Sequence, residues 1–359
     1  MRVLVLGGTR FLGRHAVTQA LAAGHEVTIL NRGQSGPGLF GGDVEALLAD
    51  RDLELPPLTR NRHWQLVIDT SAYFPRQVRR IASWLHGRVG RYQLVSSISA
   101  YADPQAADGC DEVLGTLARL PADEPEPDTV TGANYGALKA ACETAALESF
   151  GPAACLLVRP GLIVGPHDPT GRFSWWLERL RRGGDVLAPA STGTPVQWID
   201  ARDLAAWMLV QGSAGTTGAF NLTGPTDADE PQTYRSWLEA LRVAANPQAQ
   251  WCWADDDWAQ AAGVAPWADW PLWLPEAMAG LHRSPIARAK ASGLNGRPLA
   301  QTVADTLAWL DEWHAAGALP PPGPPRPRPG LAADREEALL ERWRAGEGRP
   351  QQRAVSSPA

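Results

Sequence analysis

Short hydrophobic runs alternate with longer amphipathic segments along the first half of the chain. The runs predict β-strands, and the segments between them, where apolar residues recur every three to four positions, predict helices. Strands are expected at 3–6, 26–30, 66–69, 92–96 and 155–159, and helices at 11–23, 75–86 and 134–149. Such alternation is typical of a parallel sheet with helices on both faces. We therefore expect an α/β fold of the Rossmann type, with a doubly wound parallel sheet.

The alternation weakens in the second half, where tryptophan, proline and aspartate become frequent, as in residues 251–275. The string LPPPGPPRPRPG at 319–330 is incompatible with a helix or a central strand and predicts a polyproline-like linker. An amphipathic segment at 331–345 predicts a last helix. These changes predict a Rossmann domain at 1–165 that regains a strand from about 195–225, a smaller substrate-binding domain at 166–318, and a proline-rich linker and tail at 319–359.

Composition and charge narrow the class of protein. The chain has 359 residues, of which 44% are hydrophobic and 20% are charged, the balance of a globular protein with a sizeable core. A formal net charge of −6 argues against nucleic acid or an anionic membrane as the partner, because such partners favour a cationic surface. The first apolar run is too short for a signal peptide, and no run approaches the roughly 20 apolar residues of a membrane span. We therefore expect a cytoplasmic protein.

The cysteines are too scattered to suggest a metal site or a disulfide framework. Four are present, and none forms a CxxC pair: Cys110, Cys142, Cys155 and Cys252. We expect reduced thiols and no metal.

The motif GGTRFLG at 7–13 directly follows the first predicted strand and opens the first predicted helix. A dinucleotide-binding loop requires this position, because backbone N–H groups at a helix start can face a pyrophosphate. Gly7 permits a tight turn, and Gly13 permits close packing of the helix against the strand. The motif therefore predicts nucleotide binding, with a plain turn as the alternative.

The end of the second predicted strand bears on the choice of cofactor. An acidic residue there would hydrogen-bond the ribose 2′-hydroxyl of NAD, but this strand ends in Asn31 and Arg32. A guanidinium binds phosphate with a bidentate fork, so Arg32, with Arg10 as a second cation, favours the 2′-phosphate of NADP. We expect NADP(H) as the preferred cofactor and NAD(H) as the alternative. The other interpretation of Arg32 is a solvated turn residue.

Tyr135 and Lys139 stand four residues apart in NYGALK, so on the predicted helix they share one face. A nearby ammonium favours the phenolate and lowers the pKa of a phenol from about 10, which suits the phenol to acid/base chemistry. The pair occurs by chance in many helices, and surface residues are the alternative interpretation. The spacing of Tyr135 and Lys139 indicates this chemistry only in combination with the motif at 7–13.

With these motifs in this order, the chain resembles the extended or atypical short-chain dehydrogenases/reductases of the NAD-dependent epimerase/dehydratase family, over about residues 1–315. The matching segments are GGTRFLG, NRG, ADRD at 49–52, VIDTSAY at 67–73, VSSISAY at 95–101, YGALK at 135–139, RPGLIVGP at 159–166 and QWIDARDLA at 197–205. The resemblance implies that Ser97 hydrogen-bonds the reacting oxygen, that Tyr135 transfers its proton, and that Lys139 also holds the nicotinamide ribose.

The resemblance also implies a set of cofactor contacts along the carboxyl edge of the sheet. Asp50 or Asp52 would lie near the adenine. The residues expected to bind the cofactor are Gly7, Thr9, Arg10, Phe11, Leu12, Gly13, Asn31, Arg32, Asp50, Thr70, Ser71, Ala72, Lys139 and Pro160.

The implied reaction is hydride transfer between nicotinamide C4 and a carbinol carbon. Two enzymes share this half-reaction: an NADP(H)-dependent carbonyl or sugar-nucleotide reductase, and a sugar-nucleotide epimerase. Ile98 and Ser99 stand where the family's dehydratases carry an Asp-Glu pair, so dehydration is disfavoured.

One departure from the family pattern leaves a different class of function open. Arg10 replaces the middle glycine of the motif, as in an atypical branch that includes RNA-linked chloroplast stem-loop-binding proteins. A non-catalytic RNA-binding or cofactor-sensing protein is therefore an alternative. The Tyr135 and Lys139 pair and the acidic net charge count against it.

The substrate is expected to be a small molecule, with a sugar nucleotide as one class. His167 and Arg172 follow RPGLIVGP and could bind an anionic group such as a diphosphate, although a lone loop histidine is more often a surface residue. The tryptophans between Trp237 and Trp273 could line a sugar pocket by stacking, or they could fill a core.

Two further expectations concern structure rather than chemistry. Asp200, Arg202 and Asp203 predict a structural ion-pair cluster with a helix cap. Some members of the family dimerise through the helices expected here at 75–86 and 134–149, which suggests a homodimer by analogy.

Overall fold

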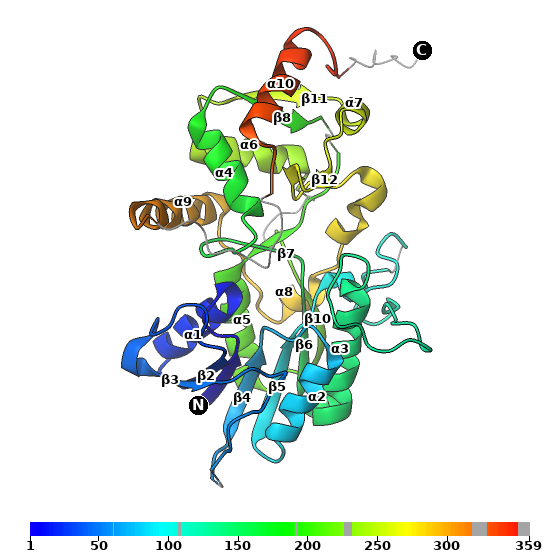
Figure 1. Ribbon diagram of the computed structural model, residues 1–359. Coiled ribbons are helices and arrows are strands. Elements are labelled where there is room, and N and C mark those ends of the chain that lie inside the picture. Colours follow the sequence, from blue (N-terminus) through cyan, green and yellow to red (C-terminus); the bar gives the residue numbers. More distant parts are fainter. Residues whose placement is uncertain (60, 107–108, 191–192, 226–231, 318–328, 351–359) are drawn as a thin grey trace. The chain divides into compact units, whose positions relative to one another are not determined.

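A computed structural model describes residues 1–59, 61–106, 109–190, 193–225, 232–317 and 329–350 (Figure 1). The chain divides into two compact units, each built from three separate stretches of sequence. The first unit contains Met1–His167, Gln197–Asp229 and Gly280–Arg297, and the second contains Asp168–Val196, Glu230–Ala279 and Pro298–Ala359.

The first unit is built on a seven-stranded parallel sheet with the order β10-β6-β5-β4-β1-β2-β3. Its strands are β1 (Arg2–Leu6), β2 (Glu26–Asn31), β3 (Val44–Leu48), β4 (Trp64–Asp69), β5 (Val89–Val95), β6 (Cys155–Pro160) and β10 (Gly218–Leu222). The order reverses between β1 and β4, which is the arrangement of a doubly wound Rossmann sheet. The predicted fold class is therefore confirmed.

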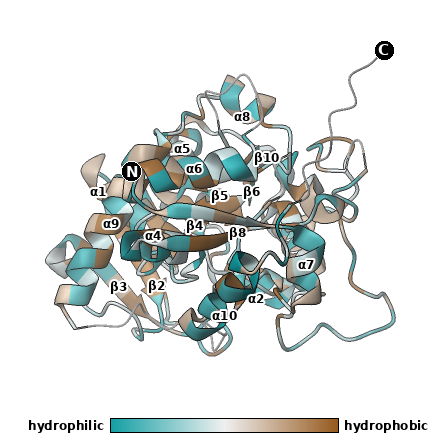
Figure 2. Ribbon diagram, turned by 90° about the horizontal axis from the view of Figure 1, so that it is seen from above, coloured by the Kyte–Doolittle hydropathy of each residue, from teal (hydrophilic) through white to brown (hydrophobic). Residues whose placement is uncertain are grey.

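Helices cover both faces of this sheet (Figure 1). One face packs against α1 (Phe11–Ala22) and α5 (Ala201–Ala214), with Ala16, Val17 and Met208 in its core. The other packs against α2 (Pro75–Trp84) and α3 (Tyr135–Phe150). Figure 2 shows both hydrophilic and hydrophobic colour on α2, as expected of a helix with one buried side.

One strand, β3, is absent from the predicted elements. It lies at the edge of the sheet, and only Val44 of its five residues is buried. Glu45 instead faces Arg62, with which it forms an ion pair. A strand with so little buried surface gives a weak hydrophobic pattern, which is why the sequence does not reveal it.

The carboxyl ends of the central strands lie level with one another. Leu6 is in register with Asp69, and Asp69 with Leu94. Parallel sheets bind ligands just outside these ends, at the point where the strand order reverses. The fold thus brings the segments GGTRFLG, TSAY and SSISAY together at one edge of the sheet.

A second, short parallel pair in the first unit joins β7 (Leu162–Val164) to β9 (Trp198–Asp200). Asp200 follows directly as the cap of α5, because its side chain accepts a hydrogen bond from the Arg202 backbone. Arg202 pairs with Asp200 and Arg297 with Asp203, so the predicted ion-pair cluster and helix cap are confirmed. The remaining short elements of this unit are α8 (Ala287–Ala291), η1 (Gly41–Asp43), η2 (Ile98–Ala100) and η3 (Pro152–Ala154).

The second unit combines helices with two short strand pairs. Its elements are α4 (Arg172–Arg182), β8 (Asp185–Pro189), α6 (Tyr234–Ala245), β11 (Gln250–Ala254), α7 (Asp256–Ala261), β12 (Pro266–Trp267), β13 (Trp270–Pro271), α9 (Leu299–Ala315) and α10 (Ala333–Arg344), while η4 (Glu276–His282) begins in it. Trp237, Trp270 and Trp273 have no exposed surface, so these tryptophans fill the core rather than line an open pocket.

The tail helix predicted at 331–345 is confirmed as α10 and is an integral part of the second unit. Its Glu336 is buried, pairs with Arg179 at 2.5 Å, and accepts a hydrogen bond from the Leu187 backbone. The proline-rich string at 319–330 precedes it, and residues 319–328 of that string lie outside the described residues. Among the helices that the structure describes, none is both long enough and apolar enough to cross a membrane.

Candidate active site

The turn between β1 and α1 leaves no room for side chains at its two outer glycines. Gly7 has a φ of 88°, and a Cβ on it would lie 2.8 Å from Ser71 Oγ. A Cβ on Gly13 would lie 2.2 Å from the Gly7 carbonyl oxygen. The predicted conformational roles of both glycines are therefore confirmed.

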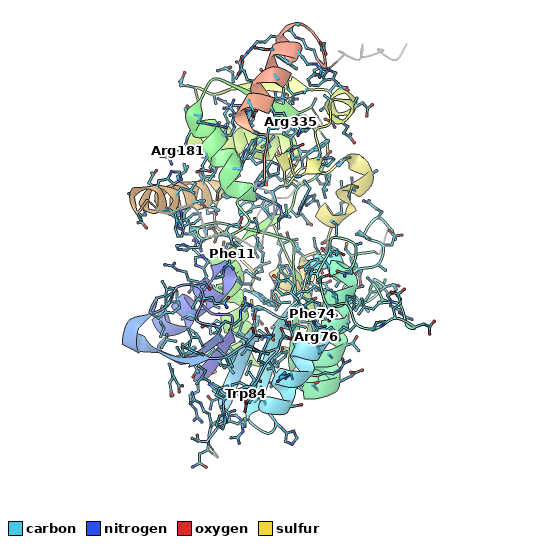
Figure 3. The ribbon with its side chains drawn as sticks, viewed as in Figure 1. Phe11, Phe74, Arg76, Trp84, Arg181 and Arg335 are labelled. Carbon is cyan, nitrogen blue, oxygen red and sulfur yellow. The ribbon has the colours of Figure 1, made fainter. Side chains whose placement is uncertain are left out.

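The first turn of α1 presents backbone donors beside this turn. Arg10 is the N-cap residue, is extended, and makes no side-chain cap hydrogen bond. The N–H groups of Phe11, Leu12 and Gly13 fall in the first turn, where no intrahelical acceptor exists. Figure 3 labels Phe11 at the start of the helix. The geometry suits an anion such as a pyrophosphate.

The end of β2 places Arg32 in solvent and fixes Asn31. The Asn31 side chain accepts a hydrogen bond from the Gly33 backbone at 2.8 Å, so it holds the turn. The Arg32 side chain is 60% exposed, and its nearest carboxylate is Asp50 at 3.9 Å. An exposed pair at this distance contributes little, so the guanidinium can bind another anion.

Ser35 also lies in this region, although no sequence motif pointed to it. Its hydroxyl lies 3.2 Å from the hydroxyl of Thr9 in the glycine turn. Left-handed glycines at 33, 36 and 38 curl the loop back towards Thr9. The signal in the sequence was the glycine-rich run NRGQSGPGLFGG, which is too irregular for a helix.

The structure separates the two aspartates expected near the adenine. Asp52 accepts a hydrogen bond of 2.7 Å from the Gln77 side chain on α2, so it ties the loop after β3 to that helix. Asp50 lies beside Arg32 and remains the better adenine candidate. Between them, Arg51 turns inward and is buried. Its neighbours Asp50 and Asp52 are polar, the first half-buried and the second exposed, so no local hydrophobic pattern predicts this burial.

Ser97 and Tyr135 are held by two elements in direct contact. Ser97 is the N-cap of η2, and its hydroxyl accepts a hydrogen bond from the Ser99 backbone at 3.1 Å. Tyr135 is the first residue of α3. The next residue, Gly136, lies so close to η2 that a Cβ would be 2.0 Å from the Ser99 carbonyl oxygen.

Lys139 is buried one turn further along α3, and its ammonium is fixed by two backbone carbonyls. It donates to Ala72 at 2.8 Å and to Val95 at 2.6 Å, at the ends of β4 and β5. The ammonium also lies 5.3 Å from the centre of the Tyr73 ring, which is 6.5 Å from the Tyr135 ring. An ammonium has three protons, so one N–H remains for a further acceptor.

The positions of Thr70, Ser71 and Pro160 complete the predicted set. The Thr70 hydroxyl donates to the Leu6 carbonyl at 2.9 Å, and Ser71 lies against Gly7. Pro160 ends β6 in register with Leu222 of β10. All three therefore lie at the carboxyl edge of the sheet that carries the glycine turn.

Beneath Pro160, a buried polar network supports α3 and β6. Arg159 forms a two-pronged ion pair with Glu143 of α3 and donates to the Tyr101 hydroxyl at 2.9 Å. Tyr101 in turn donates to the Asn221 side chain. Burial raises the pKa of Tyr101 to about 12, so this phenol stays protonated as a structural donor.

The two substrate candidates fall in different units. His167 belongs to the first unit, is half-buried, and lies 5.7 Å from the ring of His15. Burial, Arg14 and His15 lower the pKa of His167 to about 3, so the imidazole is neutral near pH 7. Arg172 belongs to the second unit and lies 5.0 Å above the Trp267 ring.

Asp168, next in the chain, gives a test of pH dependence. Its carboxylate is buried and accepts hydrogen bonds from the backbone and hydroxyl of Thr170, and burial raises its pKa to about 6. A raised pKa means that the folded state binds the proton more tightly, so stability is lost as the pH rises from about 4 through 6. We expect Asp168→Asn to stabilise the protein at pH 8 by about 3 kcal/mol, and by much less at pH 4.

Urea unfolding of both proteins at the two pH values measures this difference. The control is Asp257→Asn, which neutralises an exposed carboxylate on α7 and should leave the pH profile unchanged. Equal stabilisation of the Asp168 variant at both pH values would contradict the prediction.

No cluster of three or more His, Cys, Asp or Glu side chains suited to a metal ion occurs within the described residues. All four cysteines are free and buried. Burial raises the pKa of Cys142 to about 12, so its thiol is unreactive near neutral pH.

Comparisons with known proteins agree with this arrangement. Residues 3–222 match the model of the family described as the NAD dependent epimerase/dehydratase family. No curated protein matches the sequence significantly.

Solved structures resemble the chain over most of its length. Pal from Bacillus thuringiensis is 15% identical, with a TM-score of 0.60 over 87% of this chain and 99% of that chain. The UDP-N-acetylglucosamine 4-epimerase of Bacillus cereus is 16% identical, with a TM-score of 0.56 over 86% and 98%. The Bordetella bronchiseptica enzyme WbmG, solved with NAD and UDP, is 16% identical, with a TM-score of 0.58 over 87% and 96%. At such identities the likeness concerns the fold alone.

Proposed function

The chain belongs to the NAD-dependent epimerase/dehydratase family, and from this premise we propose that it is a nicotinamide-dependent oxidoreductase or epimerase with Tyr135 as its acid/base. The observation that carries the proposal is the contact between the start of α3 and the Ser97 turn. It sets a phenol, a hydroxyl and a buried ammonium at the edge of the sheet that carries the glycine turn.

The residues at this edge fit a dinucleotide. A Cβ on Gly7 would clash with Ser71 and one on Gly13 with the Gly7 carbonyl oxygen, so glycine at both positions allows the tight turn that leads into the first turn of α1. We propose that the first turn of α1 binds the pyrophosphate, that Asp50 lies near the adenine, and that Thr70, Ser71, Ala72 and Pro160 border the nicotinamide half. A bound nicotinamide would supply or accept the hydride.

The protein's own groups then move a proton and hold the reacting oxygen. Ser97 would donate a hydrogen bond to the substrate oxygen, and Tyr135 would give or take the hydroxyl proton. Lys139 keeps one N–H beyond its bonds to Ala72 and Val95, which suits it to hold the ribose hydroxyls. Its fixed positive charge also favours the phenolate form of a nearby tyrosine.

We propose a sugar nucleotide as the substrate class, because several proteins of similar fold were solved with UDP or UDP-glucose. A reductase and an epimerase remain the two candidate activities. Neither Ile98 nor Ser99 supplies the acid that dehydration requires, so we do not propose a dehydratase.

A two-part assay tests the proposal. The protein is incubated with NADPH or NADH and a panel of carbonyl compounds, and separately with NAD and UDP-glucose or UDP-N-acetylglucosamine. Oxidation of the reduced nucleotide would identify a reductase, and inversion of the sugar without net oxidation would identify an epimerase. Nucleotide binding without turnover on any compound would instead favour the cofactor-sensing alternative.

We further propose that the cofactor is NADP(H) in preference to NAD(H), and Arg32→Ala tests this. No carboxylate ends β2, and the Arg32 side chain is 60% exposed. Loss of a charge-assisted contact with the 2′-phosphate should weaken NADPH binding about tenfold or more. NADH lacks this phosphate, so its affinity should hardly change.

Fluorescence titration of both proteins with both nucleotides provides the measurement, and NADH is the internal control. Equal loss of affinity for the two nucleotides would mean that Arg32 shapes the loop rather than reading the phosphate. Tighter binding of NADH by the unmodified protein would contradict the preference itself.

A homodimer through α2 and α3 stays a prediction from the family resemblance. A cavity of about 630 Å³ borders α3, and it is lined by Arg79, Thr116, Leu117, Ala118, Arg119, Leu120, Ala137, Ala140, Ala141 and Thr144.

A further inference from the structure

A buried ion pair joins Arg51, in the loop after β3, to Asp69, the last residue of β4. The Arg51 side chain is 8% exposed and that of Asp69 is fully buried. Two parallel hydrogen bonds join them, Nη1 to Oδ2 at 3.0 Å and Nη2 to Oδ1 at 2.9 Å. The proposed chemistry uses neither residue.

The Asp69 carboxylate is fully satisfied. Besides the two bonds from Arg51, it accepts one from the Tyr92 hydroxyl at 2.7 Å and one from the Ser71 backbone at 3.1 Å. Burial alone would raise the pKa of Asp69, but Arg51 and these hydrogen bonds hold it below its usual range. The pair therefore stays ionised and rigid at neutral pH.

Arg51 also reaches the glycine turn itself. Its Nη2 donates a second bond, of 3.1 Å, to Ser71 Oγ, and that hydroxyl donates to the Leu6 carbonyl at 3.2 Å. The same oxygen is the atom that a Cβ on Gly7 would meet at 2.8 Å. A chain of contacts thus runs from the guanidinium through Ser71 to the peptide where β1 turns towards α1.

Stability alone gives no strong reason to bury such a pair. The loss of hydration offsets much of the attraction, and apolar replacements of buried pairs are often neutral or stabilising. A guanidinium instead fixes geometry, because its planar N–H donors orient the Asp69 carboxylate and the Ser71 hydroxyl at the same time.

We propose that Arg51 is a positioning residue for the nucleotide, because it holds Ser71 and, through it, the backbone of the glycine turn in the shape that accepts the pyrophosphate. This inference deepens the proposed function and rests on it. Arg51 does not contact the nucleotide in this proposal, and it affects nucleotide binding only through Ser71.

Arg51→Lys tests the inference. A lysine keeps the positive charge beside Asp69, so the variant is expected to fold. Its single ammonium cannot make both the two-pronged pair with Asp69 and the hydrogen bond to Ser71. NADPH and NADH should both bind about tenfold more weakly, the equivalent of one hydrogen bond to a charged group. Loss for both nucleotides distinguishes this effect from that of Arg32→Ala, which should be selective.

Tyr92→Phe is the matched control. It also removes one hydrogen bond from Asp69, but on the side away from Ser71, so it should lower stability in urea without changing nucleotide affinity. If Tyr92→Phe weakened nucleotide binding as much as Arg51→Lys does, Arg51 would have only a general structural role. If Arg51→Lys left nucleotide binding unchanged, the inference would be overturned. If the unmodified protein binds neither nucleotide, the proposed function fails, and the inference fails with it.

Discussion

Replacing Tyr135 by phenylalanine is expected to lower kcat by about 10²- to 10⁴-fold, the usual contribution of a positioned general acid or base. The hydroxyl is the only group that the change removes, because phenylalanine keeps the ring that packs near Tyr73. The helix should also form as before, since Tyr135 lies at its first position and is half-buried. Steady-state kinetics on the substrate identified in the two-part assay measures the loss.

Cofactor affinity provides the control within the same experiment. Tyr135 is proposed to act on the substrate proton, so the titration curve with NADPH should match that of the unmodified protein. A large loss of nucleotide binding would instead place the phenol in the binding site. Full activity in the variant would remove Tyr135 from the mechanism and revive the non-catalytic alternatives.

Periodicity alone predicted the architecture of the first unit. The strands β1, β2, β4, β5 and β6 are buried over most of their length, so each appears in the sequence as a mainly apolar run. The edge strand β3 lacks that run and was missed. The local sequence therefore reveals a strand where both of its sides are buried, and does not reveal it where one side faces solvent.

The glycine turn was also predictable. A side chain at Gly13 is excluded by the Gly7 carbonyl of the same motif, and a side chain at Gly7 is excluded by Ser71, just after the adjacent strand β4. Arg51 and Ser35 were not predictable. Arg51 depends on Asp69 and Ser71, 18 and 20 positions away, and Ser35 on Thr9, 26 positions away. Such partners are joined only by the packing of different strands.

The ammonium of Lys139 shows the same limit at the proposed catalytic centre. The spacing of four from Tyr135 placed both residues on one face of a helix, which the structure bears out as part of α3. The carbonyls that fix the ammonium come from Ala72 and Val95, 67 and 44 positions away. The sequence predicted which charge is present, whereas the tertiary structure determines how firmly that charge is held.

Gly136→Ala is expected to lower kcat by about 100-fold without a comparable loss of cofactor binding. A Cβ at Gly136 would lie 2.0 Å from the Ser99 carbonyl oxygen, and backbone at that distance must move. The shift would separate the start of α3 from η2, and so Tyr135 from Ser97. A misplacement of about 1 Å in a catalytic group is enough for a loss of this size.

Gly132→Ala is the matched control for this change. Gly132 lies four residues earlier in the turn that leads into α3, and a Cβ there would meet nothing within 4 Å. The control should therefore keep full activity. Because alanine favours a helix more than glycine does, Gly136→Ala should not weaken α3 itself, and its effect on turnover reports the contact with η2. An unimpaired Gly136→Ala enzyme would show that the reaction tolerates movement between Ser97 and Tyr135, and the two residues would then not act on one substrate oxygen.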